Sequence, residues 1–313
     1  MKIIAGSLLL IAVLSAGCLA RKDRATPSRD RQATVMRGSP DDCLGPADAA
    51  GPLVRFAVIG DFGDAGPNES SVAALVNQWQ PDFVITVGDN NYPSGAAETI
   101  DENIGQYFHG FIAPYGGKFG AGAGENRFFP SLGNHDWLTA GAQPYLDYFT
   151  LPGNERYYDF VRGNVHLFAL DSDPSEPDGV AVDSAQAQWL RAGLAAAPEK
   201  WRVVYMHHPP YSSGPHGSNA YMQWPFRQWG ATFVVSGHDH DYERVEADGM
   251  TYLVCGLGGA PAYQFGPALS GTRARFQGGY GAGLVEVGAE HMRFRFHAVD
   301  GRLIDQTCLS VAP

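Results

Sequence analysis

Short apolar runs alternate with helical patterns from residue 53 onward, and this alternation limits most strongly what the chain can fold into. Each of six runs is bounded by glycine, proline or polar residues, as buried strands are. The predicted strands are 53–59, 83–87, 128–132, 165–170, 202–206 and 232–235. Helices are expected at 70–79, at 183–197 with Asp183 or Ser184 as the cap, and over roughly 221–229. Together these elements predict an α/β domain.

Helical patterns end after residue 250, and further strands follow one another. These are expected at 251–254, 284–287, 292–297 and 303–309. The order contains no internal repeat and marks no second domain. We therefore expect one α/β sandwich of two sheets with helices outside.

Polar side chains follow nearly every predicted strand of the α/β part, in short turns that contain glycine. Ligand sites in open α/β sheets lie at the carboxyl ends of strands, and glycine lets the backbone turn sharply there. The five turns are Gly60-Asp61-Phe62-Gly63, Gly88-Asp89-Asn90-Asn91-Tyr92, Gly133-Asn134-His135-Asp136, Met206-His207-His208-Pro209 and Gly237-His238-Asp239-His240.

The residue types in and near these turns favour a transition-metal site. Five of the ten histidines belong to this set: His135, His207, His216, His238 and His240. Carboxylate, imidazole and phenolate together suit iron, zinc or manganese. A single Gly-Asp turn is a weak signal, whereas five such turns in order, each after a predicted strand, indicate a shared site. Asp136, Asp239 and Asp241 are interpreted as residues that orient turns or histidines.

The five motifs resemble those of the purple acid phosphatases, a family within the calcineurin-like metallophosphoesterases. Asp-x-Gly occurs at 61–63, Gly-Asp-x-x-Tyr at 88–92, Gly-Asn-His-(Asp/Glu) at 133–136, Val-x-x-His at 204–207 and Gly-His-x-His at 237–240. Gly63 and Tyr92 favour this family over other metallophosphoesterases, which usually have Asp-x-His and lack the tyrosine. The resemblance is to the small, single-domain type and implies a four-layer αββα sandwich of two mixed sheets flanked by helices.

The resemblance also implies a binuclear metal centre. Fe(III) would be bound by Asp61, Asp89, Tyr92 and His240. A divalent Fe, Zn or Mn would be bound by Asn134, His207, His238 and Asp89, which would bridge the two ions. His135 and His216 would contact the phosphate or protonate the leaving group.

The function implied is that of an acid phosphatase, in which a metal-bound hydroxide attacks small phosphate monoesters. A histidine that protonates the leaving alkoxide predicts an acidic optimum, and a tyrosinate bound to iron predicts a purple or pink protein. Two alternatives stay open: a phosphodiesterase or nucleotidase of the same superfamily, and a non-catalytic, metal-binding surface lipoprotein. The loops 107–124 and 256–283, which carry no motif, are expected to decide the substrate.

The first twenty residues predict export. Lys2 precedes an apolar run at 3–14, and small residues lead into Cys18. Residues 14–18 resemble a bacterial lipobox in which Cys18 is lipidated; the alternative is secretion with cleavage near Ala20. We expect a signal peptide at 1–20, a flexible tether at 21–50 and a catalytic domain at 51–313. The product would be a cell-envelope lipoprotein that contacts the membrane through its lipid, or a secreted or periplasmic protein.

Charge is unevenly distributed along the chain. The chain has 22 Lys+Arg and 33 Asp+Glu, a net charge of −11. Residues 1–37 hold seven basic and two acidic side chains, a net of +5, so the remainder carries −16. Broad phosphate neutralisation needs clustered basic residues, so no nucleic-acid partner is expected. An anionic substrate must be attracted locally, by the metal ions. No feature of the sequence predicts the oligomeric state.

The four cysteines predict one disulfide. Cys43 and Cys308 lie near the two ends of the expected domain, and chain ends are commonly close together, so they are the preferred pair. Cys255 lies in an apolar run and is predicted to be a buried small hydrophobe. No Cys-x-x-Cys spacing occurs, which argues against a thiolate zinc site.

Overall fold

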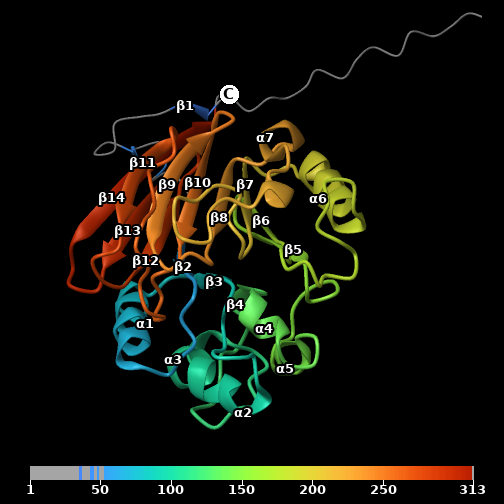
Figure 1. The fold of residues 1–313 in the computed structure, drawn as a ribbon, viewed down its shortest axis with the longest axis vertical. Coiled ribbons are helices and arrows are strands. Elements are labelled where there is room, and N and C mark those ends of the chain that lie inside the picture. Colours follow the sequence, from blue (N-terminus) through green and yellow to red (C-terminus); the bar gives the residue numbers. More distant parts are fainter. Residues whose placement is uncertain (1–34, 37–42, 46–47, 49–52, 312–313) are drawn as a thin grey trace, which may run out of the picture. The chain divides into compact units, whose positions relative to one another are not determined.

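Two seven-stranded sheets form the centre of the fold in this computed structural model, which describes residues 35–36, 43–45, 48 and 53–311 (Figure 1). The first sheet has the order β1-β14-β13-β12-β2-β3-β4. Its strands are β1 (Val35–Met36), β2 (Val54–Ile59), β3 (Phe83–Val87), β4 (Phe128–Ser131), β12 (Gly281–Val287), β13 (His291–Ala298) and β14 (Leu303–Val311). Strands β2, β3 and β4 are parallel, and β12 joins β2 antiparallel.

The second sheet has the order β11-β9-β10-β8-β7-β6-β5. Its strands are β5 (Tyr158–Arg162), β6 (Val165–Ala169), β7 (Trp201–Tyr205), β8 (Phe233–Ser236), β9 (Tyr242–Ala247), β10 (Met250–Cys255) and β11 (Thr272–Phe276). Strands β6, β7, β8 and β10 are parallel, while β5, β9 and β11 pair antiparallel. The prediction of two mixed sheets is confirmed.

Helices flank the two sheets, as predicted (Figure 1). The α-helices are α1 (Pro67–Trp79), α2 (Ala97–Ile100), α3 (Gln106–Phe108), α4 (Asn134–Trp137), α5 (Gln143–Tyr148), α6 (Ala185–Ala196) and α7 (Phe226–Trp229). A π-helical turn spans Asp101–Gly105, and 3-10 turns span His109–Phe111 and Ala220–Met222. No helix in the described part of the chain combines the length and apolarity that crossing a membrane requires.

The ends of the two longest helices follow local chemistry. Helix α1 begins at Pro67, three residues before the predicted start, because proline fits the first helical position, where no backbone N–H is needed. Helix α6 is capped by Ser184, whose side chain accepts a hydrogen bond from the N–H of Ala187. The second of the two predicted caps is therefore the correct one.

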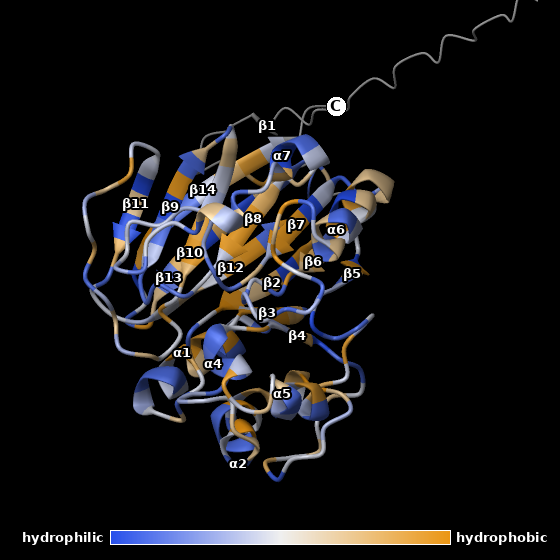
Figure 2. Cartoon of the chain, turned by 45° about the vertical axis from the view of Figure 1, so that its right-hand side comes forward, coloured by the Kyte–Doolittle hydropathy of each residue, from blue (hydrophilic) through white to orange (hydrophobic). Residues whose placement is uncertain are grey.

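Apolar side chains fill the space between the sheets and beneath the outer helices. Every residue of β3 is buried, and Figure 2 shows hydrophobic colouring along the central strands. In β13 burial alternates, so that Met292, Phe294 and Phe296 face the core. A separate cluster lies on the opposite face of the second sheet, where Phe168 of β6 belongs to the same cluster as Leu190 of α6 and Phe226 of α7. This packing fixes the strand ends that carry the polar turns.

The sequence interpretation was wrong for one helix and missed four strands. Residues 221–229 form a 3-10 turn followed by α7, because Pro225 lacks an N–H and disfavours helical geometry at Trp224. Strands β1, β5, β9 and β11 were not predicted, and β1, β5 and β11 are edge strands. Edge strands tolerate charged residues such as Arg273 and Arg275 of β11, so they lack the apolar run of a central strand. Strand β11 therefore lies within the 256–283 segment that was expected to be a loop.

The predicted disulfide joins Cys43 to Cys308, and Cys255 is free and buried, as expected. The bond links the start of the described domain to β14. The predicted signal peptide and most of the predicted tether lie outside the described residues. Within the tether range, β1 pairs with β14.

Replacing both Cys43 and Cys308 with serine is expected to lower the free energy of unfolding by about 2–4 kcal/mol, because the bond closes a long loop in the unfolded chain. Urea denaturation of the oxidised protein and the double variant would measure the loss. An unchanged urea midpoint in the double variant would contradict the stabilising role of the disulfide. Cys255→Ser is the control, because it replaces a cysteine that forms no disulfide.

Candidate metal centre

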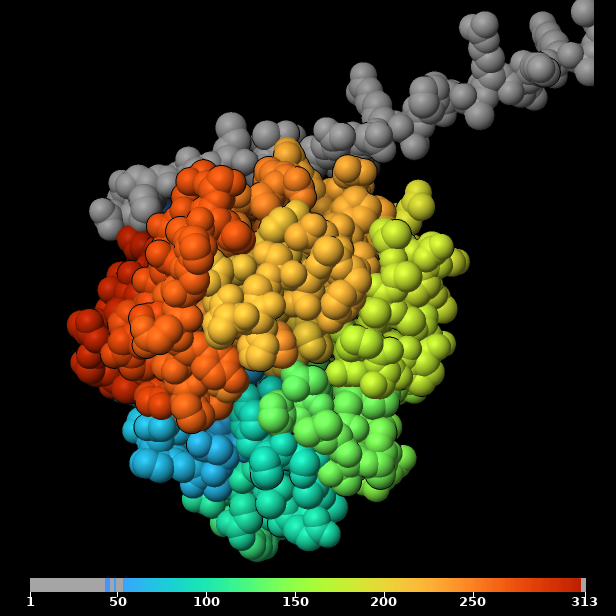
Figure 3. All heavy atoms as spheres, in the orientation of Figure 1, coloured from blue at the N-terminus to red at the C-terminus, as the bar shows by residue number. Residues whose placement is uncertain are grey.

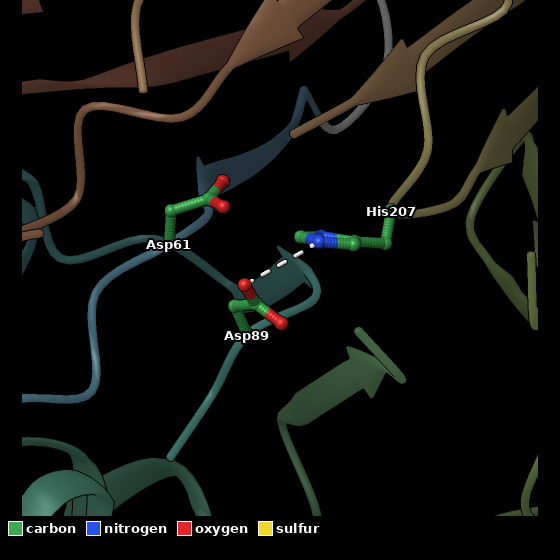
Figure 4. A group of neighbouring side chains, drawn as sticks. All are labelled: Asp61, Asp89 and His207. Atoms are coloured by element: carbon green, nitrogen blue, oxygen red, sulfur yellow. Dashed lines mark ion pairs between the residues drawn. The ribbon is translucent and has the colours of Figure 1, made fainter. Parts of the chain in front are cut away.

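The seven predicted metal ligands lie in turns at the carboxyl ends of β2, β3, β4, β7 and β8. Asp61 follows β2, Asp89 and Tyr92 follow β3, Asn134 begins α4, His207 follows β7, and His238 and His240 follow β8. Figure 4 shows Asp61, Asp89 and His207 pointing toward one another. Each of these three offers a ligand atom, and the atoms lie within 4.8 Å of one another. The fold thus brings together residues separated by up to 179 positions in the sequence, Asp61 and His240.

One group of side chains surrounds the phenol of Tyr92. Its Oη lies 3.0 Å from Oδ2 of Asp89 and 3.1 Å from Nε2 of His240. Oδ1 of Asp61 lies 3.5 Å from both Tyr92 Oη and His240 Nε2. These are the four residues that the motifs assign to Fe(III).

A second group surrounds the imidazole of His207. Its Nε2 lies 2.9 Å from Oδ1 of Asn134 and 3.1 Å from Nδ1 of His238. Oδ2 of Asp89 lies 3.4 Å from the same nitrogen. Because this oxygen also contacts Tyr92, Asp89 is the residue that touches both groups.

The backbone at three of these positions is left-handed. The φ angles are 55° at Asp61, 51° at Asp89 and 72° at His238. Such conformations cost on the order of 1 kcal/mol or more in a residue other than glycine, and they concentrate at functional sites. Gly63 allows the first two turns to touch, since a Cβ there would lie 1.7 Å from the carbonyl oxygen of Asn90.

Backbone carbonyl groups fix the orientation of the histidine rings. Nδ1 of His207 lies 2.9 Å from the oxygen of Val87, and Nδ1 of His240 lies 2.9 Å from that of Pro261. A carbonyl accepts from Nδ1–H, which leaves Nε2 free to face the site. Tyr263 stacks on His240 with ring centroids 4.0 Å apart. Pro261 and Tyr263 lie in the 256–283 segment that was expected to decide the substrate, but the sequence did not predict that they hold a predicted ligand, since no motif surrounds them.

The charges at the centre are suited to cations. Asp61 and Asp89 are 0% and 1% exposed, and the charge of His207 favours the ionised form of both. Burial raises the pKa of Asp61 well above its ordinary value, and the charge of Asp89 adds to this. Burial would also raise the pKa of Asp89, but His207 and hydrogen bonds hold it below its ordinary value. Buried carboxylates need such compensation, and metal ions supply it. The donor set therefore fits two metal ions.

The two predicted catalytic histidines lie at the mouth of the site. His135 is half-buried, with its ring 4.6 Å from that of Tyr92 and its Nε2 3.9 Å from Asp89 Oδ2. His216 is exposed, with its ring 4.3 Å from that of His238. Figure 3 shows the gold segment around residue 215 beside the green segment around residue 135 on one exposed face. Both histidines can therefore be reached by a molecule from solvent.

Two of the three acidic residues predicted to orient the turns do so. Asp136 accepts hydrogen bonds from the N–H groups of Asn90 and Gly133, which ties the second turn to the third. Asp239 accepts from His216 N–H. Neither carboxylate oxygen of Asp241 has a hydrogen-bond partner among the described residues, so Asp241 orients no neighbour in this way. Burial and the charges of Asp239 and Glu243 raise the pKa of Asp241 to about 9.

Comparison with known families agrees with this geometry. Residues 54–242 match the family model described as calcineurin-like phosphoesterase. The chain belongs to this family. The matched range contains all seven predicted ligands and both histidines that are predicted to be catalytic.

Several curated proteins are similar to this calcineurin-like phosphoesterase over most of their length. It is 24% identical to tartrate-resistant acid phosphatase type 5 of Homo sapiens over 308 residues, which cover 84% of this chain and 93% of that protein. It is 26% identical to purple acid phosphatase 17 of Arabidopsis thaliana over 258 residues, which cover 72% and 73%.

Solved structures show the same fold. Purple acid phosphatase PPD1 from yellow lupin (Lupinus luteus) seeds superposes with a TM-score of 0.67 at 16% identity, covering 83% of this chain and 54% of that chain. This calcineurin-like phosphoesterase therefore spans little more than half of the lupin protein. GAP50, the anchor in the inner membrane complex of Plasmodium, gives a TM-score of 0.67 at 18% identity, with 83% and 90% covered.

Proposed function

We propose that this calcineurin-like phosphoesterase is a binuclear acid phosphatase that hydrolyses phosphate monoesters. The observation that carries the proposal is the position of Asp89 Oδ2, 3.0 Å from Tyr92 Oη and 3.4 Å from His207 Nε2. One carboxylate thus contacts both groups of predicted ligands, as a bridging ligand must. The names of the relatives, tartrate-resistant and purple acid phosphatase, support the choice of monoesters.

The side chains divide between a harder and a softer site. Asp61, Asp89, Tyr92 and His240 would hold Fe(III), which prefers carboxylate and phenolate, and Asn134, His207, His238 and Asp89 would hold a divalent Fe, Zn or Mn. When bound, two such ions offset the negative charge of a phosphate ester and lower the pKa of water.

In this proposal His135 moves a proton. Its Nδ1 lies 2.7 Å from the carbonyl oxygen of Pro93, which accepts the Nδ1 proton and leaves Nε2 directed to the site. In the imidazolium form Nε2 can donate a proton to the oxygen of a leaving alcohol. Because the relatives are named acid phosphatases, we propose an acidic pH optimum.

Hydrolysis assays test the proposal. The purified, metal-loaded protein should hydrolyse p-nitrophenyl phosphate faster at pH 5 to 6 than at pH 8, and faster than bis-p-nitrophenyl phosphate. A preference for the diester would instead support the phosphodiesterase alternative, and a preference for nucleoside monophosphates the nucleotidase. A protein that binds two metals and hydrolyses none of these would support the non-catalytic alternative.

Tyr92→Phe tests the assignment of iron. Burial and the charges of Asp61 and Asp89 raise the pKa of Tyr92 well above its ordinary value, so the phenol ionises only when a metal displaces its proton. Iron-loaded wild type should therefore be coloured, and Tyr92→Phe should lose the visible band. Tyr263→Phe, which also removes a phenol oxygen near the site, is the matched control and should keep the band. A band that survives in Tyr92→Phe would contradict the assignment.

We also propose that the N-terminal segment directs export as a lipoprotein signal that ends before Cys18, and that Cys18 carries a lipid. The support is the basic residue, apolar run and small residues that precede Cys18. Mass spectrometry of the mature N-terminus in the native host would test this, since a free N-terminus after Ala20 would instead indicate simple secretion.

A further inference from the structure

The loop that carries His216 has little regular structure of its own. Between His207 and the 3-10 turn at 220–222, residues 208–219 contain three prolines, two glycines and three serines, and form no helix or strand. His216 itself is exposed. The position of its ring beside His238 must therefore be set by contacts that hold the loop backbone.

Asp239 supplies two of these contacts. It is fully buried, and it lies in the chain between the predicted ligands His238 and His240. Its Oδ1 accepts a hydrogen bond from His216 N–H at 2.9 Å, and its Oδ2 accepts from Ser212 Oγ at 2.5 Å. Ser212 Oγ in turn accepts from Gly214 N–H at 3.0 Å. One carboxylate thus binds both ends of the segment 212–216.

Glu243 holds the middle of the same segment. Its carboxylate accepts from the N–H and the Oγ of Ser213, at 2.6 and 2.8 Å. The loop also fits closely against Asp239, because a Cβ added at Gly214 would lie 2.3 Å from the carboxyl carbon of Asp239. The segment is therefore fixed by buried charged acceptors and by steric contact.

We propose that Asp239 is a positioning residue that holds His216 over the metal centre. The turn that supplies His238 and His240 thereby also sets the place of His216, whose ring lies 4.3 Å from that of His238. Both oxygens of Asp239 are directed at the loop, so the residue acts through His216 and not as a third metal ligand of the turn. The inference rests on the proposed phosphatase function, in which His216 contacts the phosphate or the leaving group.

A double-mutant cycle in the metal-loaded full chain tests the proposal. Asp239→Ala should lower kcat/KM for p-nitrophenyl phosphate roughly 10- to 100-fold, as loss of an orienting partner does. In a His216→Ala background Asp239→Ala should lower kcat/KM less than about twofold, because substitutions of residues that act as a unit do not have additive effects. Asp239→Asn should restore most of the activity, since its amide oxygen can accept from His216 N–H and its NH₂ can donate to Ser212 Oγ. Equal losses in both backgrounds would overturn the proposal.

Variants in the 212–216 segment test whether the effect of Asp239→Ala comes only from damage to the turn that carries His238 and His240. If Asp239→Ala loses metal or fails to fold, Ser212→Ala and Gly214→Ala take its place in the cycle, because they disturb the same contacts from the loop. Each should lower kcat/KM in the wild-type background and have little further effect in the His216→Ala background. Gly45→Ala, where an added Cβ meets no atom within 4 Å, is the matched control for Gly214→Ala. Full activity in both loop variants would overturn the proposal.

Hydrogen exchange separates this inference from the proposed function. Exchange at residues 212–216 should rise in Asp239→Ala and stay near the wild-type level in Asp239→Asn. If the wild type hydrolyses no monoester, the proposed function fails, and the exchange result alone decides whether Asp239 holds the loop. Equal exchange in the wild type and Asp239→Ala would overturn the proposal even in an active enzyme.

Discussion

Asp89→Asn is expected to lower kcat/KM for a phosphate monoester at least about a thousandfold, because several kcal/mol of charge stabilisation would depend on the two metals that this carboxylate is proposed to join. The amide has no negative charge and bridges two cations poorly. Asp89 Oδ1 also accepts from His135 N–H, so the change would disturb the proton donor as well.

Metal analysis beside the assay identifies the cause. Asp89→Asn should retain one equivalent of metal or less, whereas the wild type retains two. Asp300→Asn, an exposed surface carboxylate that pairs with Arg302, is the matched control and should keep both metals and activity. If Asp89→Asn binds two metals and turns over the substrate at nearly the wild-type rate, Asp89 is not an essential bridging ligand.

Metal affinity is expected to rise at least about tenfold for each pH unit between pH 6 and 9, because a metal must displace at least one proton from the site. Burial opposes the charged form of His207, but the negative charges of Asp89 and Asp61 and the hydrogen bond to Asp89 raise its pKa to about 10. A raised pKa means that the ring holds its proton throughout this range, while a metal binds only the neutral ring. Raising the pH therefore favours the metal.

Calorimetry in buffers of different ionisation enthalpy would count the released protons. At least one proton per divalent ion is expected for the wild type at pH 7. His166→Gln removes a histidine outside the site, where it pairs with Asp159 and Glu199, and should release as many protons as the wild type. A binding enthalpy that is independent of the buffer would contradict the displaced proton at His207.

The central strands could be predicted because burial on both faces leaves an uninterrupted apolar run, as in β3. The two edge strands of the second sheet, β5 and β11, could not be predicted, because their sequences carry charged residues, as in β11, and lack an uninterrupted apolar run. A helix prediction failed for a similarly local reason. The apolar residues of 221–229 suggested one helix, but the pyrrolidine ring of Pro225 interrupts it.

The sequence by itself determined the chemistry of this calcineurin-like phosphoesterase: which residue types follow each buried strand, and the motifs that relate them. Only the tertiary structure decided that Asp89 Oδ2 touches both ligand groups, that Pro261 and Tyr263 fix the ring of His240, and that Asp239 faces the His216 loop. The reason is physical. A motif depends on local backbone geometry, whereas these contacts join segments up to 118 positions apart, Asp89 and His207, whose separation is fixed only when the two sheets pack.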